Sequence, residues 1–394
     1  MKIKYFVVFF VCLGFAGYSQ KTPADKGKLQ VGAERLEAYL PALKGKKIGL
    51  VLNHTATVGA SNLLDTLLSL GIRVEKVFVP EHGLRGTADA GEKITDGKDP
   101  RTGVPVISLY GKKRKPSAED VAGLDLLVFD IQDVGVRFYT YISTLHHVMD
   151  GCVEHNLPLM VLDRPNPNGH FIDGPILDTA YRSFVGMHPV PIVHGMTIGE
   201  YARMINGQGW LPGGKSCKLE VIPCAHYTHD TPYTLPLKPS PNLPNMRSIY
   251  LYPSICYFEG TQVSLGRGTN KQFQVLGTPG FPKGDYQFTP EPYEGAMDPF
   301  LKGQLCTGYD LSNLNPDDIR NWRKIDLSYL IHFYQEYPQK EKFFLANNFI
   351  DKLAGGDHLR KQIIAGMSEA DIRATWQDGL KAYKAMRKPY MLYP

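Results

Sequence analysis

The sequence predicts an α/β protein with a Rossmann-like, doubly wound parallel sheet domain and a smaller C-terminal α/β domain. Between residues 46 and about 224, short apolar runs alternate with segments of helical spacing. The runs are apolar almost throughout, which is typical of strands buried on both faces of a parallel sheet. The chain has 394 residues, of which 43% are hydrophobic and 21% charged, enough for two domains.

Six apolar runs are predicted to form the strands of the first domain. Helices lie between them, and right-handed crossovers place these helices on both faces of the sheet. The predicted strands are 47–52, 74–79, 104–109, 124–130, 157–163 and 219–223.

Leucine spacing and capping patterns predict the intervening helices. Ser117 with Asp120, and Thr197 with Glu200, have the spacing of a capping box at a helix N-terminus. The predicted helices are 61–70, one that starts after Ser117, 139–155 and 197–206.

A proline-rich segment, 231–244, cannot be helix or central strand and separates this pattern from a glycine-rich region. Helices are then predicted at 327–336, 351–365 and 369–386. We place the domain boundary near residue 250, which gives a catalytic domain over 20–250 and an auxiliary domain over 251–394.

Residues 1–19 have the pattern of a secretory signal peptide. Lys2 and Lys4 precede an apolar run, with cleavage predicted near Ser19. The run is short for a bilayer span, so we expect an exported, periplasmic protein without stable membrane insertion after cleavage. Cleavage removes two lysines and no acids, which lowers the formal charge from +5 to +3. This charge is too small to indicate a nucleic-acid partner.

Neither a cofactor nor a metal site is predicted. The first strand is followed by the sequence NHTAT at 53–57 rather than a glycine-rich turn, which argues against a dinucleotide. Cys224, His226 and His229 do not have the spacing of a familiar zinc site. Five cysteines remain after cleavage, and buried free thiols are favoured over a Cys217–Cys224 disulfide.

Polar residues follow four of the predicted strands. The carboxyl ends of parallel strands share one edge, where open α/β sheets bind their ligands. Helix caps and turns explain any single Asp or Asn there, but not four strand ends rich in acids, amides, arginines and tyrosines. The candidate residues are Asn53, His54, Glu81, His82, Arg85, Asp130, Asp133, Arg137, Tyr139, Tyr141, Arg164 and Asn166.

The loop after the second strand carries two glutamates, Glu81 and Glu92, which are suited to general acid/base chemistry. Glycoside hydrolysis uses two carboxyl groups about 5 Å or about 6.5–9.5 Å apart, depending on stereochemistry. The alternative is that one of the two forms an ion pair with Arg85, and Asp130 and Asp133 are reserve acids. Tyrosine rings and arginine forks nearby are suited to an acidic sugar.

Several long motifs carry a resemblance to a known family. They are GLVLNHT (49–55), PEHGLRG (80–86), AGE (90–92), DIQDVGVRFYTY (130–141), LDRPNP (162–167), PNLPN (241–245), EGT (259–261) and GRGT (266–269). By these motifs the chain resembles the NamZ-type exo-β-N-acetylmuramidases, formerly a family of unknown function, over roughly 45–394.

The resemblance implies a site in the cleft between the two domains, and release of N-acetylmuramic acid from the non-reducing end of peptidoglycan fragments. It implies no NAD and no metal. It makes Glu92 the first choice for the catalytic glutamate, with Glu81 second. The lactyl carboxylate of the substrate is expected on Arg137, Arg164 or Arg267, and its acetamido group on Asn53, Asn166, Asn242 or Asn245.

Two other functions are compatible with the residues alone. One is a different wall hydrolase, such as an amidase, esterase or deacetylase, for which a chelator would abolish metal-assisted activity. The other is a muropeptide-binding protein without turnover. The acids at the strand ends argue against such a receptor, because carboxylates repel an anionic ligand.

Overall fold

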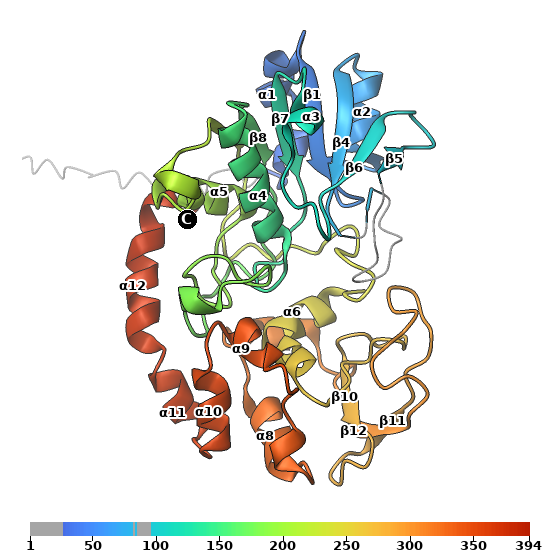
Figure 1. The fold of residues 1–394 in the computed structure, drawn as a ribbon, viewed down its shortest axis with the longest axis vertical. Helices are drawn as coiled ribbons and strands as arrows, with labels where there is room; N and C mark the ends of the chain where they lie inside the picture. Colours follow the sequence, from blue (N-terminus) through green and yellow to red (C-terminus); the bar gives the residue numbers. More distant parts are fainter. Residues whose placement is uncertain (1–26, 82, 85–95) are drawn as a thin grey trace, which may run out of the picture.

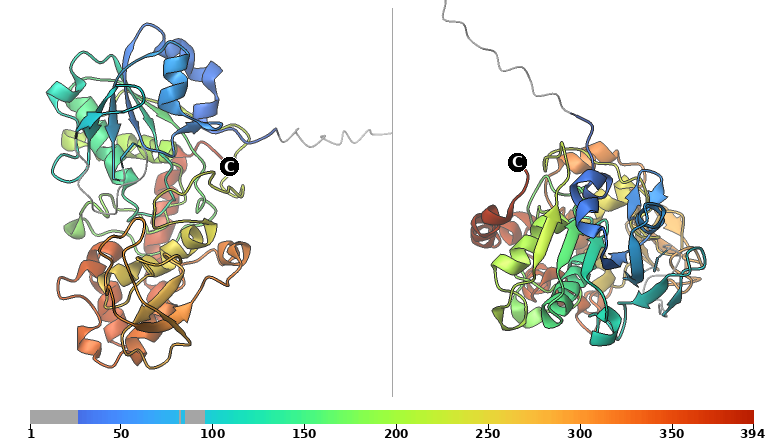
Figure 2. Two further views of the ribbon diagram at one scale, coloured as in Figure 1. Left: turned by 90° about the vertical axis from the view of Figure 1, so that its right-hand side faces the viewer. Right: turned by 90° about the horizontal axis from the view of Figure 1, so that it is seen from above.

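The computed structural model describes residues 27–81, 83–84 and 96–394. The chain forms two halves stacked along the long axis of the molecule, with the large sheet in one half and the C-terminal segments in the other (Figure 1). The side view shows the same division (Figure 2). Helix α12 (Gln377–Arg387) runs along one side of the molecule and returns the chain end toward the sheet half.

The large sheet has seven strands in the order β5-β6-β4-β1-β7-β8-β9. All neighbours are parallel except β5, which is antiparallel to β6. Leaving β5 aside, the strands follow the 3-2-1-4-5-6 order of Rossmann folds, which confirms the predicted fold class. The strands are β1 (Lys47–Leu52), β4 (Arg73–Val79), β5 (Gly97–Lys98), β6 (Pro105–Ser108), β7 (Leu126–Asp130), β8 (Leu159–Leu162) and β9 (Leu219–Ile222).

Both faces of this sheet are buried because successive side chains of each strand enter different cores. In β7, Leu126 and Val128 pack into one core, with residues of α1 (Leu36–Leu43) and α2 (Leu63–Ser69). Leu127 and Phe129 pack into the other, with residues of α4 (Tyr141–Glu154) and α5 (Ile198–Gly207). A strand whose two faces are both covered has no solvent-facing positions, which explains the continuous apolar runs.

Capping side chains set the starts of three of these helices. Asn62 caps α2 by accepting a hydrogen bond from the Leu64 N–H, so α2 begins later than predicted. The residues before it pair instead as β2 (Thr57–Val58) and β3 (Ser61–Asn62). The predicted capping boxes of α3 (Ala118–Val121) and α5 are both present.

The second half contains elements that the sequence did not indicate. The proline-rich segment 231–244 has no helix or strand, as expected. Unpredicted are α6, a 3-10 helix η4, a short helix α7 and a three-stranded antiparallel sheet in the order β10-β12-β11. Their bounds are α6 (Met246–Ile255), η4 (Cys256–Gly260), β10 (Val275–Thr278), β11 (Tyr286–Phe288), β12 (Cys306–Asp310) and α7 (Pro316–Asn321).

The helices predicted at 351–365 and 369–386 are each divided into two shorter helices, so the prediction of two continuous helices was wrong. The first breaks because Gly355 adopts a left-handed conformation, with φ of 82°. The helices of this part are α8 (Ser328–Glu336), α9 (Phe349–Ala354), α10 (His358–Ile364), α11 (Glu369–Ala374) and α12.

The end of the chain is anchored on the sheet half. The Tyr393 hydroxyl donates to Asp163 Oδ2 at 2.6 Å, and the Leu392 N–H donates to Glu200 Oε1 at 2.7 Å. Asp163 follows β8 and Glu200 lies in α5. These buried, charge-assisted hydrogen bonds hold the end of the chain on the sheet half.

The five described cysteines are all buried free thiols, so the alternative Cys217–Cys224 disulfide does not form. Within the described ranges, no helix is long and apolar enough to cross a bilayer.

Candidate active site

The carboxyl edge of the large sheet meets the second half of the molecule at a small polar cavity of about 220 Å³. Glu81 follows β4, Tyr110 follows β6, and Tyr139 and Tyr141 lie at the start of α4, after β7. This is the edge where open α/β sheets bind ligands. The opposite wall comes from residues beyond 239, including Asn242, Tyr252, Glu259, Arg267 and Phe273.

Glu81 is held by a tyrosine from the neighbouring strand. The Tyr110 hydroxyl donates to Glu81 Oε1 at 2.8 Å. Burial, reinforced by the negative charge of Glu81, raises the pKa of Tyr110 above its ordinary value. Tyr110 therefore stays protonated at neutral pH and remains a donor to this carboxylate.

Tyr141 has a related environment. Burial and the charge of Glu81 raise its pKa as well, and the Asn53 Nδ2 group donates to the Tyr141 hydroxyl at 2.9 Å. Asn53 Oδ1 in turn accepts from the Thr55 backbone N–H at 2.9 Å and from its hydroxyl. Asn53 is fully buried, so it orients Tyr141 and does not line the cavity itself.

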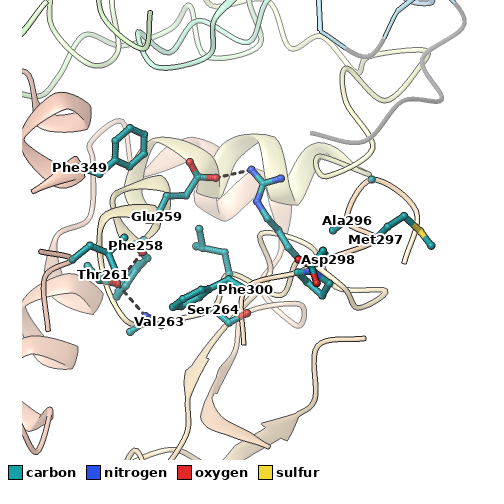
Figure 3. A pocket seen from close by; sticks show the side chains of 15 residues that line it. Phe258, Glu259, Thr261, Val263, Ser264, Ala296, Met297, Asp298, Phe300 and Phe349 are labelled. Carbon is teal, nitrogen blue, oxygen red and sulfur yellow. Dashed lines mark hydrogen bonds and ion pairs between the residues drawn. The ribbon is translucent and has the colours of Figure 1, made fainter. Parts of the chain in front are cut away.

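An ion pair forms part of the opposite wall. Arg267 Nη2 lies 2.5 Å from Glu259 Oε1, and the Arg267 guanidinium lies over the Phe273 ring, 5.0 Å from its centroid. Figure 3 shows Glu259 with this ion pair, between two groups of apolar side chains. Both side chains remain about a quarter exposed, at 28% for Arg267 and 26% for Glu259. Among the described residues lining this cavity, Arg267 is the one cation.

Two further predicted residues reach the cavity. Tyr139 donates its hydroxyl hydrogen to the Pro239 carbonyl at 2.9 Å, which ties the start of α4 to the proline-rich segment. Asn242 donates from Nδ2 to the Gly295 carbonyl at 2.8 Å. The Asn242 side-chain oxygen is buried and has no hydrogen-bond partner among the described residues.

Arg164 and Asp130 lie elsewhere, in a buried two-contact ion pair. Arg164 Nε is 2.5 Å from Asp130 Oδ1, and Nη2 is 2.8 Å from Asp130 Oδ2. The pair joins the end of β7 to the residues after β8. The Arg164 guanidinium is thus occupied by a protein carboxylate, and neither residue lines the cavity.

Arg137 and Asp133 are buried as well. Arg137 donates to three backbone carbonyls, those of Pro175, Val190 and Leu353, and so connects the two halves. Asp133 Oδ2 accepts from the Gly135 N–H at 2.6 Å, and burial raises the pKa of Asp133 to about 7. Neither is among the residues that line the cavity.

Three more predicted residues serve local structure. Asn166 Nδ2 donates to the Met196 carbonyl, and Asn245 caps α6 by accepting from the Ser248 N–H. His54 Nε2 lies 2.8 Å from the Lys238 carbonyl oxygen. The predictions for Glu92, His82 and Arg85 fall outside the described residues.

The cavity also contains residues that the sequence analysis did not single out as site residues. Tyr110 directly follows the third predicted strand (104–109), so its place at the same sheet edge is the signal that marks it. Glu259 belongs to the EGT motif (259–261), and only the family resemblance marks it. Tyr252 lies in the unpredicted helix α6.

Cys224 and His229, two of the three residues with metal-binding side chains near 224–229, have protein partners. His229 Nε2 lies 2.8 Å from Glu200 Oε2, and the Cys224 thiol donates to the Asp163 carbonyl. In the described part of the chain, no three His, Cys, Asp or Glu side chains group as metal ligands would.

Comparisons with known proteins cover nearly the whole chain. Residues 48–247 match the family described as exo-beta-N-acetylmuramidase NamZ, N-terminal, and residues 250–393 match the corresponding C-terminal family. The peptidoglycan beta-N-acetylmuramidase NamZ of Bacillus subtilis (strain 168) is 38% identical, over 95% of this chain and 94% of its own length.

Two solved structures from Bacteroides fragilis NCTC 9343, both DUF1343 family proteins, share the fold. One is 49% identical with a TM-score of 0.86, and the other is 27% identical with a TM-score of 0.79. Each alignment covers 93% of this chain and 99% of the other chain. The chain therefore belongs to the NamZ family of exo-β-N-acetylmuramidases.

Proposed function

We propose that this protein is an exo-acting β-N-acetylmuramidase, a glycoside hydrolase that releases N-acetylmuramic acid from the non-reducing end of peptidoglycan fragments. The observation that carries the proposal is family membership over both halves of the chain. The cavity at the sheet edge supports it, because two glutamates, several tyrosines and an arginine meet there.

The chemistry follows from paired carboxyl groups. One carboxylic acid protonates the glycosidic oxygen, and a second carboxylate activates water or attacks the sugar carbon. Glu92 remains our first choice for a catalytic residue and Glu81 the second. Glu81 Oε1 accepts a hydrogen bond from the Tyr110 hydroxyl, which holds the carboxyl group at the wall of the cavity.

The functional groups of the sugar match the polar wall. A lactyl carboxylate can bind the Arg267 guanidinium, which has donors beyond the one used by Glu259. The buried Asn242 side-chain oxygen, which has no partner among the described residues, can accept the acetamido N–H once this side chain turns toward the sugar. The largely buried rings of Tyr139 and Tyr141 give part of the cavity wall an apolar surface for the pyranose ring.

The direct test is release of free N-acetylmuramic acid from a chromogenic muramide and from muramic-acid-terminated peptidoglycan fragments. We expect release of the terminal sugar from both substrates. An enzyme that cleaves only internal bonds, or one that binds the fragments without turnover, contradicts the proposal. A chelator-sensitive removal of acetyl or peptide groups would instead identify a different wall hydrolase.

The proposed contact between Arg267 and the lactyl carboxylate leads to a second prediction. Removing a hydrogen bond to a charged group costs about 1.5–3 kcal/mol, so Arg267→Met should lower kcat/KM for the muramide about 10- to 100-fold. The effect should vanish for a muramide whose lactyl group is a neutral methyl ester. Arg101→Met, at an exposed arginine outside the cavity, is the matched control. An unchanged preference for the free acid in Arg267→Met would assign the carboxylate to another residue.

We also propose export to the periplasm, where the polymer lies, with cleavage near Ser19. The pattern of lysines and apolar residues in 1–19 supports this proposal. Cell fractionation, with the mass of the mature N-terminus, tests it, and full-length protein confined to the cytoplasm would contradict it.

A further inference from the structure

A second, larger cavity of about 790 Å³ lies beside the Glu81 cavity. Glu259 and Arg267 line both cavities, so their ion pair forms the shared wall. Figure 3 shows this second cavity, with Phe349, Phe258 and Thr261 on one side and Met297 and Asp298 on the other. Every residue of its lining belongs to the second half of the chain, between 258 and 349.

The lining is mostly apolar and includes side chains that solvent can reach. Phe300 is 46% exposed and Met297 is 59% exposed, although large apolar side chains are usually covered. The hydroxyl of Thr261 donates to the Phe258 carbonyl and so is satisfied within the protein. Exposed apolar side chains that line a concave surface indicate a binding site.

The charges of the lining restrict what can bind. The described charged residues are Glu259, Asp298 and Arg267, and Arg267 is already paired with Glu259. The net charge of the wall is therefore negative. An anionic peptide would be repelled there, whereas a neutral saccharide would bury the apolar faces of its rings at no electrostatic cost.

We propose that this second cavity binds the leaving group of the substrate at its first sugar, the neutral N-acetylglucosamine next to the terminal muramic acid. The inference rests on the proposed function. The small polar cavity holds the acidic sugar that is released, and the larger apolar cavity holds the neutral sugar that follows it. The scissile bond then lies near the Glu259–Arg267 pair, where the two cavities meet.

The test compares two substrates that differ only in the leaving group. One is a muramyl–N-acetylglucosamine disaccharide, and the other is a muramyl fluoride, whose leaving group is a single atom and cannot reach the second cavity. Loss of one aromatic contact is worth about tenfold in affinity. We expect Phe300→Ala to raise KM for the disaccharide about tenfold, and to leave kcat/KM for the fluoride within about twofold.

Control variants make the outcomes distinct. Met297→Ala should change KM in the same direction as Phe300→Ala. With two variants, misfolding of one of them does not decide the result. Leu305→Ala removes an apolar side chain that is 56% exposed but outside the cavity, and should change neither substrate.

Two results would overturn the inference. They are an equal loss on both substrates, or no loss on either. A loss that appears only with a fluoride carrying a lactyl-linked peptide would assign the cavity to the peptide and also overturn it. A wild-type protein that hydrolyses neither substrate would instead contradict the proposed function.

Discussion

Replacing the candidate catalytic glutamates should abolish most activity while leaving the fold intact. General acid–base groups contribute about 10²- to 10⁴-fold to a rate, so Glu92→Gln and Glu81→Gln should each lower kcat on a muramide by this order. The amide keeps the size of the side chain but cannot ionise. For Glu81→Gln it still accepts the Tyr110 hydrogen bond, so the loss will report lost chemistry rather than lost packing.

The two glutamates can be separated by how each variant fails. A variant that has lost its nucleophile or base recovers turnover with added azide or formate, whereas a variant that has lost only a binding contact raises KM. Glu119→Gln, at an exposed position on α3, is the matched control and should retain full activity. Activity that survives both Glu92→Gln and Glu81→Gln would remove the carboxylate assignment, and Glu259 would become the next acid to test.

The strands of the large sheet were predictable because burial on both faces leaves a continuous apolar run. β1 has the predicted bounds, and the other five predicted strands are present with shifted ends. Helix starts were predictable where a side chain caps them, as Thr197 does for α5. The sequence of the second half contains weaker indications of secondary structure. Its strands are short, and α6 contains Pro253, which normally argues against a helix.

The cavity was predictable in part, through the rule that parallel strands deliver their ends to one edge. This rule found Glu81, Tyr139 and Tyr141. It could not find Glu259, because that residue reaches the cavity from a 3-10 helix of the second half. Such a placement depends on how the halves pack, which no local pattern encodes.

The arginines show a second limit of predicting site residues from the sequence. Residue type marks Arg137, Arg164 and Arg267 equally as cations suited to a carboxylate. In the structure Arg137 binds three backbone carbonyls, Arg164 binds Asp130, and only Arg267 of these lines the cavity. The competing partners are distant in sequence, so spacing alone could not separate a structural arginine from one that faces a ligand.

The buried Asp130–Arg164 pair makes the largest stability prediction. The side chains are 0% and 2% exposed, and each is hydrogen-bonded in two contacts with the other. Removing one member of a buried pair leaves the other buried without its partner and costs about 3–5 kcal/mol. We therefore expect Arg164→Met to lower the free energy of unfolding by this amount in urea denaturation.

A double-mutant cycle measures the interaction energy between Asp130 and Arg164. Burial raises the pKa of Asp130 even with Arg164 beside it, so in Arg164→Met the carboxyl should take up a proton rather than remain charged. Asp130→Leu with Arg164→Met removes both charges and should recover much of the lost stability, because apolar replacements of buried pairs are often neutral.

An arginine-to-methionine substitution at an exposed ion pair gives the stability loss against which Arg164→Met is compared. Arg101 lies 3.4 Å from Asp65 and its side chain is 68% exposed, so Arg101→Met should cost less than about 1 kcal/mol. If Arg164→Met were as mild as Arg101→Met, the pair would not hold β7 to β8. Arg164 would then be free to leave Asp130 for the carboxylate of a substrate. A large loss in Arg164→Met that the double variant recovers would instead fix Arg164 as a structural residue of the sheet edge, and leave Arg267 as the described arginine for the lactyl group.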